Sequence, residues 1–201
     1  MTPDELRESN ALLQTLSPGE IVDWAHERFA RTLAMSTSFG ANSAVLLHLV
    51  ATKLPGTPVL FVDPGDVPER NRAYAETLRK HLGFEVYTYE PYEALTSEDR
   101  ARLGESESAR QDVYARRKLE PMDRALREHG VRAIMHGIRA DQNAYRATRA
   151  PLEPRADGIV RVYPLLAMTA SAVGRYLAEH GLPLHPDGLP QGVRFECGLH
   201  L

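Results

Sequence analysis

Apolar residues occur along the chain in two alternating patterns, short continuous runs and longer segments with helical spacing. Short apolar runs are typical of buried strands. They predict strands at residues 33–37, 58–62, 84–89, 132–136 and 159–163. Apolar faces, caps and terminal glycines predict helices at residues 3–16, 18–29, 41–53, 68–82 and 169–180, and one more that follows a polar stretch at 96–111 and ends at Gly130.

Strands that alternate with helices favour a mostly parallel twisted sheet with helices on both faces. We therefore predict an α/β fold with three layers, similar to the Rossmann fold. The chain is expected to form one domain over residues 1–201, with helices in 1–31, the α/β core in 32–181 and a flexible tail in 182–201. Ligands of such folds bind beyond the carboxyl ends of the strands. Functional residues are thus expected in the loops after the first, second and fourth predicted strands.

Composition and charge narrow the classes of function. At 201 residues, with 43% hydrophobic and 25% charged residues, the chain is typical of a globular protein with a full core. No apolar run approaches the roughly 20 residues that a membrane-spanning helix needs, and the first residues lack the pattern of a signal peptide. We therefore expect a cytoplasmic protein. A net charge of −3 gives no general attraction to nucleic acid or membrane, and neither is expected as a partner.

An anion would have to meet a local cluster of cations, and five arginines fall between residues 137 and 161. They are Arg139, Arg146, Arg149, Arg155 and Arg161. The single cysteine, Cys197, excludes an internal disulfide and the multi-cysteine sites that hold zinc or iron–sulfur clusters. No metal or bound cofactor is expected, and redox chemistry would need an external partner.

The segment Ser36-Thr37-Ser38-Phe39-Gly40 joins the first predicted strand to the apolar helix that follows it. Its small hydroxyl residues place side-chain donors and backbone N–H groups at a helix N-terminus, which is a natural site for an anion. A helix cap with a glycine turn would explain the same residues equally well. The segment is not a Walker A loop, because the Gly-Lys-Ser/Thr ending is absent.

Two further loops follow predicted strands. After the second strand, Asp63 could accept hydrogen bonds from a ribose or an adenine amino group, whereas the Pro-Gly that follows is ordinary turn chemistry. After the fourth strand, Gly137 would let a phosphate approach the backbone, and Arg139 and Arg146 could bind it in bidentate fashion. A solvated arginine face is the competing interpretation.

The C-terminal segment carries the most reactive side chain. Cys197 is flanked by Glu196 and Gly198 in a stretch too short and polar to build a core, so we expect the thiol to be exposed. His200 or a nearby arginine could lower the pKa of the thiol and raise the thiolate fraction. A nucleophile on a flexible tail could close over a site and then be presented to a second protein.

With these segments in this order, the chain from about Ser17 onward resembles the phosphoadenylyl-sulfate (PAPS) reductases, relatives of the N-type ATP pyrophosphatases. The matching motifs are residues 36–40, 62–65, 119–126, Gly137-Ile138-Arg139 with Gln142 and Arg146, and Glu196-Cys197-Gly198-Leu199-His200. The resemblance implies an adenine nucleotide alpha-hydrolase-like fold. It also implies that substrate is bound by Ser36, Thr37, Ser38, Phe39, Gly40, Asp63, Gly65, Lys118, Gly137, Arg139, Gln142 and Arg146.

By this resemblance, the Cys197 thiolate attacks the sulfur of PAPS and expels adenosine 3′,5′-bisphosphate, with His200 as the second catalytic residue. The dithiol of thioredoxin, or of glutaredoxin, then attacks the S-sulfocysteine, releases sulfite and restores the thiol. The lone cysteine agrees with this scheme, since no second thiol of the chain could resolve the intermediate. The implied function is thioredoxin-dependent PAPS reduction in sulfate assimilation, by a protein for which a homodimer is one possible assembly.

Four differences from family patterns keep alternatives open. Tyr114-Ala115 stands where adenylyl-sulfate (APS) reductases carry a cysteine pair of their iron–sulfur cluster, which favours PAPS, although cluster-free forms accept APS. Pro64 replaces the threonine of an Asp-Thr-Gly motif, and Asn143 replaces the serine of a Gln-Ser pair. A Ser-x-Gly-Asp-x-His-x-Thr-like loop is missing between residues 186 and 193, which motivates a nucleotide-binding or sensing module without turnover.

A third alternative is an enzyme that adenylates its substrate with ATP and magnesium. The Ser-Gly-Gly-x-Asp-Ser loop of such enzymes is absent, and this function gives Cys197 no role.

Overall fold

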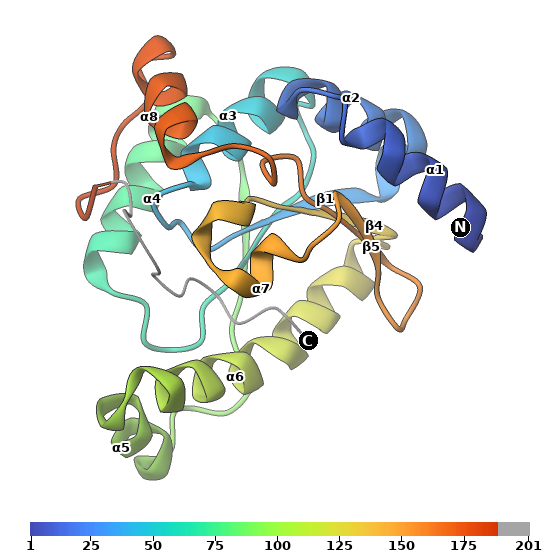
Figure 1. Ribbon diagram of the computed structural model, residues 1–201. Helices are drawn as coiled ribbons and strands as arrows, with labels where there is room; N and C mark the ends of the chain where they lie inside the picture. The colour runs from blue at the N-terminus through green and yellow to red at the C-terminus, as the bar shows by residue number, and fades with distance from the viewer. Residues whose placement is uncertain (189–201) are drawn as a thin grey trace.

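The computed structural model describes residues 1–188, which fold around a six-stranded sheet with strand order β3-β2-β1-β4-β6-β5 (Figure 1). The strands are β1 (Leu33–Thr37), β2 (Val59–Val62), β3 (Val86–Tyr89), β4 (Ala133–His136), β5 (Leu152–Pro154) and β6 (Val160–Val162). Neighbouring strands are parallel except β5 and β6, which pair antiparallel. The predicted α/β fold with a mostly parallel sheet is confirmed.

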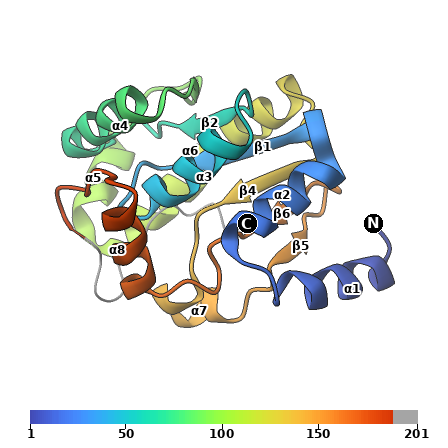
Figure 2. The ribbon, with the colours of Figure 1, turned by 90° about the horizontal axis from the view of Figure 1, so that it is seen from above.

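Helices cover both faces of this sheet. They are α1 (Pro3–Leu13), α2 (Pro18–Phe29), α3 (Ser43–Lys53), α4 (Glu69–Leu82), α5 (Ser97–Glu105), α6 (Glu107–Glu128), α7 (Ala144–Ala147) and α8 (Ala170–Glu179), with short 3-10 turns η1 (Ala30–Thr32) and η2 (Ala140–Gln142). In Figure 1, α2, α3 and α8 lie on one side of the sheet and α6 on the other. Seen from above in Figure 2, α3 crosses over the middle of the sheet. Within the described residues, no helix is both long and apolar enough to cross a membrane.

The two cores follow from the alternation of side chains along each strand. Leu33 and Met35 of β1 belong to the larger core, which includes residues of α2, α3, α4 and α8. Ala34, between them, points to the opposite face and belongs to the smaller core with Met122 and Leu126 of α6. Helix α3 is apolar on nearly every side because it lies against the sheet and under other helices. The three-layer arrangement is confirmed.

Most helix ends are where capping residues predict them. Ser17 caps α2 with a reciprocal hydrogen-bond box, and Gly83 ends α4 in the left-handed conformation at φ 69°. For the polar stretch 96–111 the sequence analysis predicted no helix or strand, whereas the structure has α5 and the start of α6 in it. Thr96 and Ser106 cap α5 and α6 there, so polar capping residues start two helices in a segment with few apolar positions.

Strand β5, which forms an edge hairpin with the predicted strand β6, and the short helix α7 were also not predicted. Strand β5 is three residues long and includes Pro154, so its sequence carries little strand signal. Strand β5 is held by a residue far from it in the sequence. The side chain of Asn10 in α1 donates one hydrogen bond to the backbone of Leu152 and accepts another from it.

Candidate functional site

A cavity with a volume of about 70 Å³ lies at the carboxyl ends of β1 and β4, the edge at which the sequence placed the site. Several predicted residues line it: Ser36, Thr37, Ser38, Gly137, Gln142 and Arg146. Four polar residues that the sequence analysis did not select also line it: Asn42, Ser43, His136 and Tyr163. The parallel pairing of β1 with β4 therefore brings two of the three predicted loops to one cavity.

One side of the cavity is built from the last residues of adjacent strands. Ser36 and His136 are register partners, and Ser36 Oγ lies 2.6 Å from His136 Nδ1. The ring of Tyr163, just after β6, lies 5.9 Å from the His136 ring between centroids. Burial and the nearby Glu153 carboxylate raise the pKa of Tyr163 to about 12. The phenol is therefore neutral at physiological pH and can donate or accept a hydrogen bond.

The loop that enters α3 contributes Thr37, Ser38 and Asn42 to the cavity lining. Phe39 adopts a left-handed backbone conformation at φ 52°, and its buried ring packs 5.1 Å from that of Phe61. Thr37 Oγ1 accepts a hydrogen bond from Phe39 N at 3.0 Å. Asn42 occupies the N-cap position of α3, yet its side chain makes no capping hydrogen bond. The positive end of the helix dipole is thus available to an anion beside the hydroxyl groups of this loop.

The predicted arginine cluster divides into two groups. Arg139 and Arg146 are each 2% exposed, although free arginine side chains are strongly hydrated. Arg146 lines the cavity. Arg149 instead pairs with Glu153 at 3.0 Å, and Arg155 lies 2.7 Å from Asp123, so these two neutralise carboxylates elsewhere.

Arg139 lies behind the lining and organises it. Its backbone N–H donates to Gln142 Oε1 at 2.8 Å, and its Nε donates to Asp141 Oδ1 at 2.9 Å. Its Nη1 donates to Asn42 Oδ1 across the cavity wall. Arg139 therefore fixes the side chains of two lining residues.

The loop after β2 has a different environment. Asp63 is buried, accepts a hydrogen bond from Gly65 N at 2.8 Å and forms an ion pair with Arg72 at 2.7 Å. Lys118 of α6 is also buried, with its Nζ 5.3 Å from the centre of the Tyr114 ring. None of Asp63, Gly65 and Lys118 is among the residues that line the cavity.

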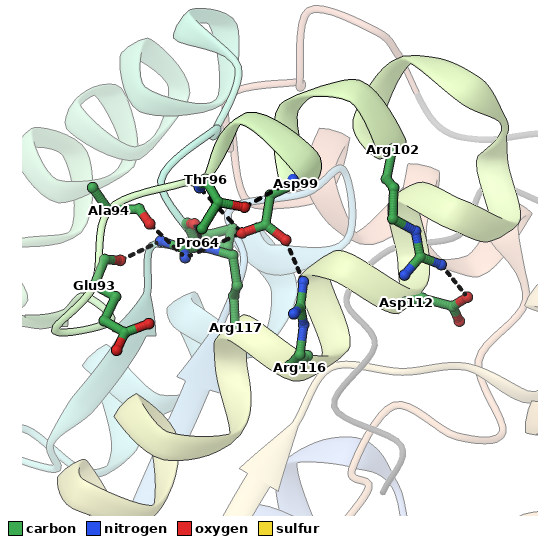
Figure 3. A network of polar contacts seen from close by, with 9 residues as sticks. All are labelled: Pro64, Glu93, Ala94, Thr96, Asp99, Arg102, Asp112, Arg116 and Arg117. Carbon is green, nitrogen blue, oxygen red and sulfur yellow. Dashed lines mark hydrogen bonds and ion pairs between the residues drawn. The ribbon is translucent and has the colours of Figure 1, made fainter.

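Figure 3 shows how Arg117 of α6 holds this loop. Arg117 Nε donates to the carbonyl of Pro64 at 2.6 Å, and its Nη2 donates to the carbonyl of Glu93 at 2.9 Å. Arg116 forms an ion pair with Asp99. In the capping box of α5, the Asp99 carboxylate accepts a hydrogen bond from Thr96 N, and Asp99 N donates to Thr96 Oγ1. The guanidinium groups bind backbone and carboxylate oxygens of the protein itself, so this network is a framework.

The predicted catalytic residues Cys197 and His200 lie outside the described residues. The last described segment is fastened to α4. Tyr74 Oη donates to the carbonyl of Pro183 at 2.9 Å, and Arg70 pairs with Asp187 at 3.0 Å. Arg70 lies in the first turn of α4, and the carbonyl of Phe39 is 3.5 Å from Asn71 Nδ2 beside it. The chain thus reaches residue 188 near the edge of the sheet that carries the cavity.

Sequence reasoning missed lining residues for two reasons. His136 and Tyr163 end predicted strands and could have been selected, because the carboxyl ends of parallel strands face ligands. Asn42 carries no such signal, since its role depends on Arg139, which is 97 positions away in the chain.

Within residues 1–188, no group of three or more His, Cys, Asp or Glu side chains is arranged to hold a metal ion.

Comparison with known proteins adds the family. Residues 32–186 match the family model described as the phosphoadenosine phosphosulfate reductase domain. The phosphoadenosine 5′-phosphosulfate reductase of a Synechococcus species is 35% identical over 228 aligned positions, which cover 98% of this chain and 97% of the relative. The enzyme of the same name from Xanthomonas campestris is 36% identical over 91% of this chain and 77% of its own length.

The longer alignment also shows a difference in length. Its 228 positions exceed the 201 residues of this chain, so the cyanobacterial relative carries segments that have no counterpart here. This agrees with the expectation that a family loop is missing.

Solved structures give the same fold. The phosphoadenylyl-sulfate reductase of Candida auris, crystallised as a phosphate complex, superposes with a TM-score of 0.75 at 25% identity, covering 92% of this chain and 90% of the other. The FMN adenylyltransferase of Candida glabrata superposes with a TM-score of 0.60 at 15% identity over 84% of this chain and 55% of the other. The second likeness concerns the fold alone.

Proposed function

The chain belongs to the phosphoadenosine phosphosulfate reductase family, and we propose that it reduces 3′-phosphoadenylyl sulfate to sulfite with electrons from thioredoxin. The observation that carries the proposal is the cavity at the ends of β1 and β4, which combines hydroxyl donors, a helix N-terminus and a buried arginine. These groups suit the phosphosulfate of the substrate. Relatives with this enzyme name align over nearly the whole chain, which supports the same activity.

The phosphosulfate anion is assigned to the cavity because its donors are already positioned there. Ser36, Thr37 and Ser38 supply hydroxyl groups, and Arg146 supplies a planar guanidinium that can bind two oxygens at once. Buried donors that are fixed before a ligand arrives bind it with little loss of conformational entropy. The phosphate bound in the related Candida auris reductase supports an anion site in this fold.

Three further predicted substrate contacts are assigned to the nucleoside and its 3′-phosphate. Asp63, Gly65 and Lys118 lie at the end of β2 and on α6, beside the cavity lining rather than in it. A nucleotide that spans the sheet edge would reach from the ends of β1 and β4 to the end of β2, since β2 pairs directly with β1. The backbone of loop 63–66 is held still for such a contact by Arg117.

The reaction is assigned to Cys197. Its thiolate forms a bond to the sulfur of the sulfuryl group while the bond from that sulfur to the phosphate oxygen breaks, and adenosine 3′,5′-bisphosphate leaves with the electron pair. A thiolate of reduced thioredoxin then attacks Cys197 Sγ, and sulfite departs with the electrons of the S–S bond. The second thioredoxin thiol resolves the mixed disulfide, so thioredoxin is oxidised and the Cys197 thiol is restored. His200 is assigned the role of stabilising the thiolate.

The test separates capture of the sulfuryl group from its reduction. The reduced protein is incubated with PAPS and, separately, with APS, and intact masses are measured before thioredoxin is added and sulfite is assayed. We expect a sulfonate adduct with PAPS that thioredoxin discharges as sulfite. Cys197→Ser should form neither adduct nor sulfite while it still binds adenosine 3′,5′-bisphosphate. Sulfite release by this variant at the parent rate would refute the assignment, and a faster adduct with APS would reassign the substrate.

A second candidate is a nucleotide-binding module without turnover, which the segments missing relative to the Synechococcus enzyme favour. On this hypothesis the bisphosphate raises the melting temperature, but no adduct forms on Cys197. Detection of the adduct eliminates it.

A further inference from the structure

The N-terminus of α3 contains a buried polar group that the proposed reaction has not used. Asn42 is 2% exposed and lines the cavity. Its Nδ2 is buried and has no hydrogen-bond partner among the described residues. A buried donor left without a partner is destabilising, so such a group calls for an explanation.

The orientation of the Asn42 amide is fixed by chemistry. Arg139 Nη1 contacts the oxygen end of the amide, and a guanidinium has donors but no acceptor. The opposite orientation would place an NH₂ group against an NH₂ group, so Oδ1 must face Arg139. Arg139 is itself held by Asp141 through Nε, and it does not line the cavity. The NH₂ group is therefore what Asn42 can offer to a ligand in the cavity that it lines.

The position of Asn42 makes an anionic oxygen the fitting partner for this donor. Asparagine at an N-cap usually accepts a hydrogen bond from the first turn with its Oδ1. Here Oδ1 is taken by Arg139 and the cap hydrogen bond is missing, so α3 begins without a side-chain acceptor at its positive end. An oxygen of a bound phosphate or sulfate would satisfy both the Nδ2 donor and the positive end of the helix.

We propose that Asn42, oriented by Arg139, is an anion-binding residue whose Nδ2 donates to an oxygen of the phosphosulfate at the start of α3. The inference rests on the proposed function and adds a determinant to it. Asn42 favours ligands with an acceptor oxygen, because its Nδ2 presents a donor to the cavity. An aspartate of the same size would present an acceptor there. Arg139 is a positioning residue that acts only through the Asn42 and Gln142 side chains.

Asn42→Asp tests the proposal, because it changes binding and stability in different directions. The carboxylate keeps an oxygen on Arg139, so the melting temperature of the ligand-free protein should not fall. It also replaces the donor with a negative charge, so affinity for adenosine 3′,5′-bisphosphate and for inorganic sulfate should fall about ten- to hundred-fold at neutral pH. Unchanged affinity for both anions would overturn the proposal, since a purely structural role is preserved by aspartate.

Asn143→Asp is the matched control. Asn143 caps α7 through an Oδ1 that accepts from Arg146 N at 2.8 Å, and it does not line the cavity. Aspartate caps equally well, so this variant adds the same charge nearby without removing a donor from the cavity. We expect a change in affinity below about threefold, the range of a screened charge. A loss equal to that of Asn42→Asp would attribute the effect to charge alone and overturn the proposal.

The outcomes separate this inference from the proposed function. If the parent produces sulfite from PAPS and Asn42→Asp binds both anions like the parent, the inference fails and the function stands. If the parent forms no sulfite from PAPS, but Asn42→Asp weakens its binding of sulfate, the proposed function fails and Asn42 stands as an anion-binding residue. Should Asn42→Asp not fold, Asn42→Ala removes the donor without adding charge, and it must still weaken sulfate binding. Absence of stabilisation of the parent by either anion defeats both.

Discussion

The loops that follow β1 and β2 lie at the same end of neighbouring parallel strands, but the partners of their polar groups differ. Around the loop after β1, hydroxyl groups, the start of α3 and Arg146 surround a cavity. In the loop after β2, the Asp63 carboxylate is taken by Arg72 and by Gly65 N, and the carbonyl of Pro64 is taken by Arg117. The first loop lines a cavity with its side chains, whereas the second, which we assign to the nucleoside, has its main polar groups paired within the protein and lies outside the cavity lining.

This difference teaches that a loop at the carboxyl end of a parallel strand is only a candidate for a ligand site. What matters is whether neighbouring elements already supply partners for its polar groups. Arg117 of α6 binds the carbonyl of Pro64 in the loop after β2, and Asp99 of α5 pairs with both Arg116 and Arg117 (Figure 3). Beside β1 the comparable arginine, Arg139, lies behind a cavity and leaves it open among the described residues. The contrast predicts that substitutions in the two regions affect different properties.

The largest effect is expected on stability, from Arg117→Ala. The Arg117 side chain is 9% exposed and donates to three backbone carbonyls, which would lose their partners. We expect a loss of about 2–4 kcal/mol in the free energy of unfolding, measured by chemical denaturation. Arg110→Ala is the control, because it removes an exposed ion pair with Glu107 and a hydrogen bond to the carbonyl of Leu103. It should lower the free energy of unfolding by less than about 1 kcal/mol. Equal losses would show that the loop after β2 needs no framework.

The next effect is expected on binding, from Arg146→Lys. Lysine keeps the charge but loses the planar fork, so affinity for adenosine 3′,5′-bisphosphate should fall about ten- to thirtyfold. Titration calorimetry measures this, together with kcat/KM for sulfite formation. Arg149→Lys is the control, because Arg149 pairs with Glu153 and stacks 3.9 Å over the Tyr145 ring outside the cavity lining. If both variants bind adenosine 3′,5′-bisphosphate with the same affinity, Arg146 has no special role in the cavity and the contrast between the two loops fails.

A smaller effect is expected from Gly65→Ala. Gly65 has φ 98°, and an added Cβ would lie 3.4 Å from Arg117 Nη2 and 3.5 Å from Leu95 Cδ1. Strain at this conformation should reduce stability by about 1–2 kcal/mol. Gly104→Ala in α5 has open space around its Cβ, so it should instead raise stability by up to about 1 kcal/mol. Thermal unfolding of the two variants must therefore shift in opposite directions.

The smallest effect at neutral pH concerns one tyrosine of each region. Burial first, and then Glu153 for Tyr163 and Asp66 for Tyr114, raise the pKa of each phenol to about 12. A folded pKa above the unfolded value of about 10 means that stability is fully present below pH 10 and is lost as pH rises toward 12. Alkaline absorbance titration should show that Tyr163→Phe and Tyr114→Phe each remove one late phenolate transition. A Tyr163 midpoint near 10 would contradict its burial.

Much of the fold is determined by local sequence. The apolar runs in β1, β2 and β4 and the capping residues Ser17 and Thr169 specify strands and helices without reference to the rest of the chain, because burial pattern and cap hydrogen bonds act over a few residues. The order of strands and helices then limits the architecture to a parallel sheet with two covered faces. The sequence therefore also determined the edge at which the site lies.

Only the tertiary structure decided which polar groups remain available at that edge. Ser36 meets His136 across 100 positions of sequence, and Asn42 meets Arg139 across 97. The sequence selected Arg139 and Arg146 from five arginines. Packing placed Arg146 in the cavity lining and Arg139 behind it, and paired Arg149 and Arg155 with carboxylates elsewhere. The physical reason is that a side chain's type sets which hydrogen bonds it can make. The partners that reach it through folding decide which of those bonds are left for a ligand.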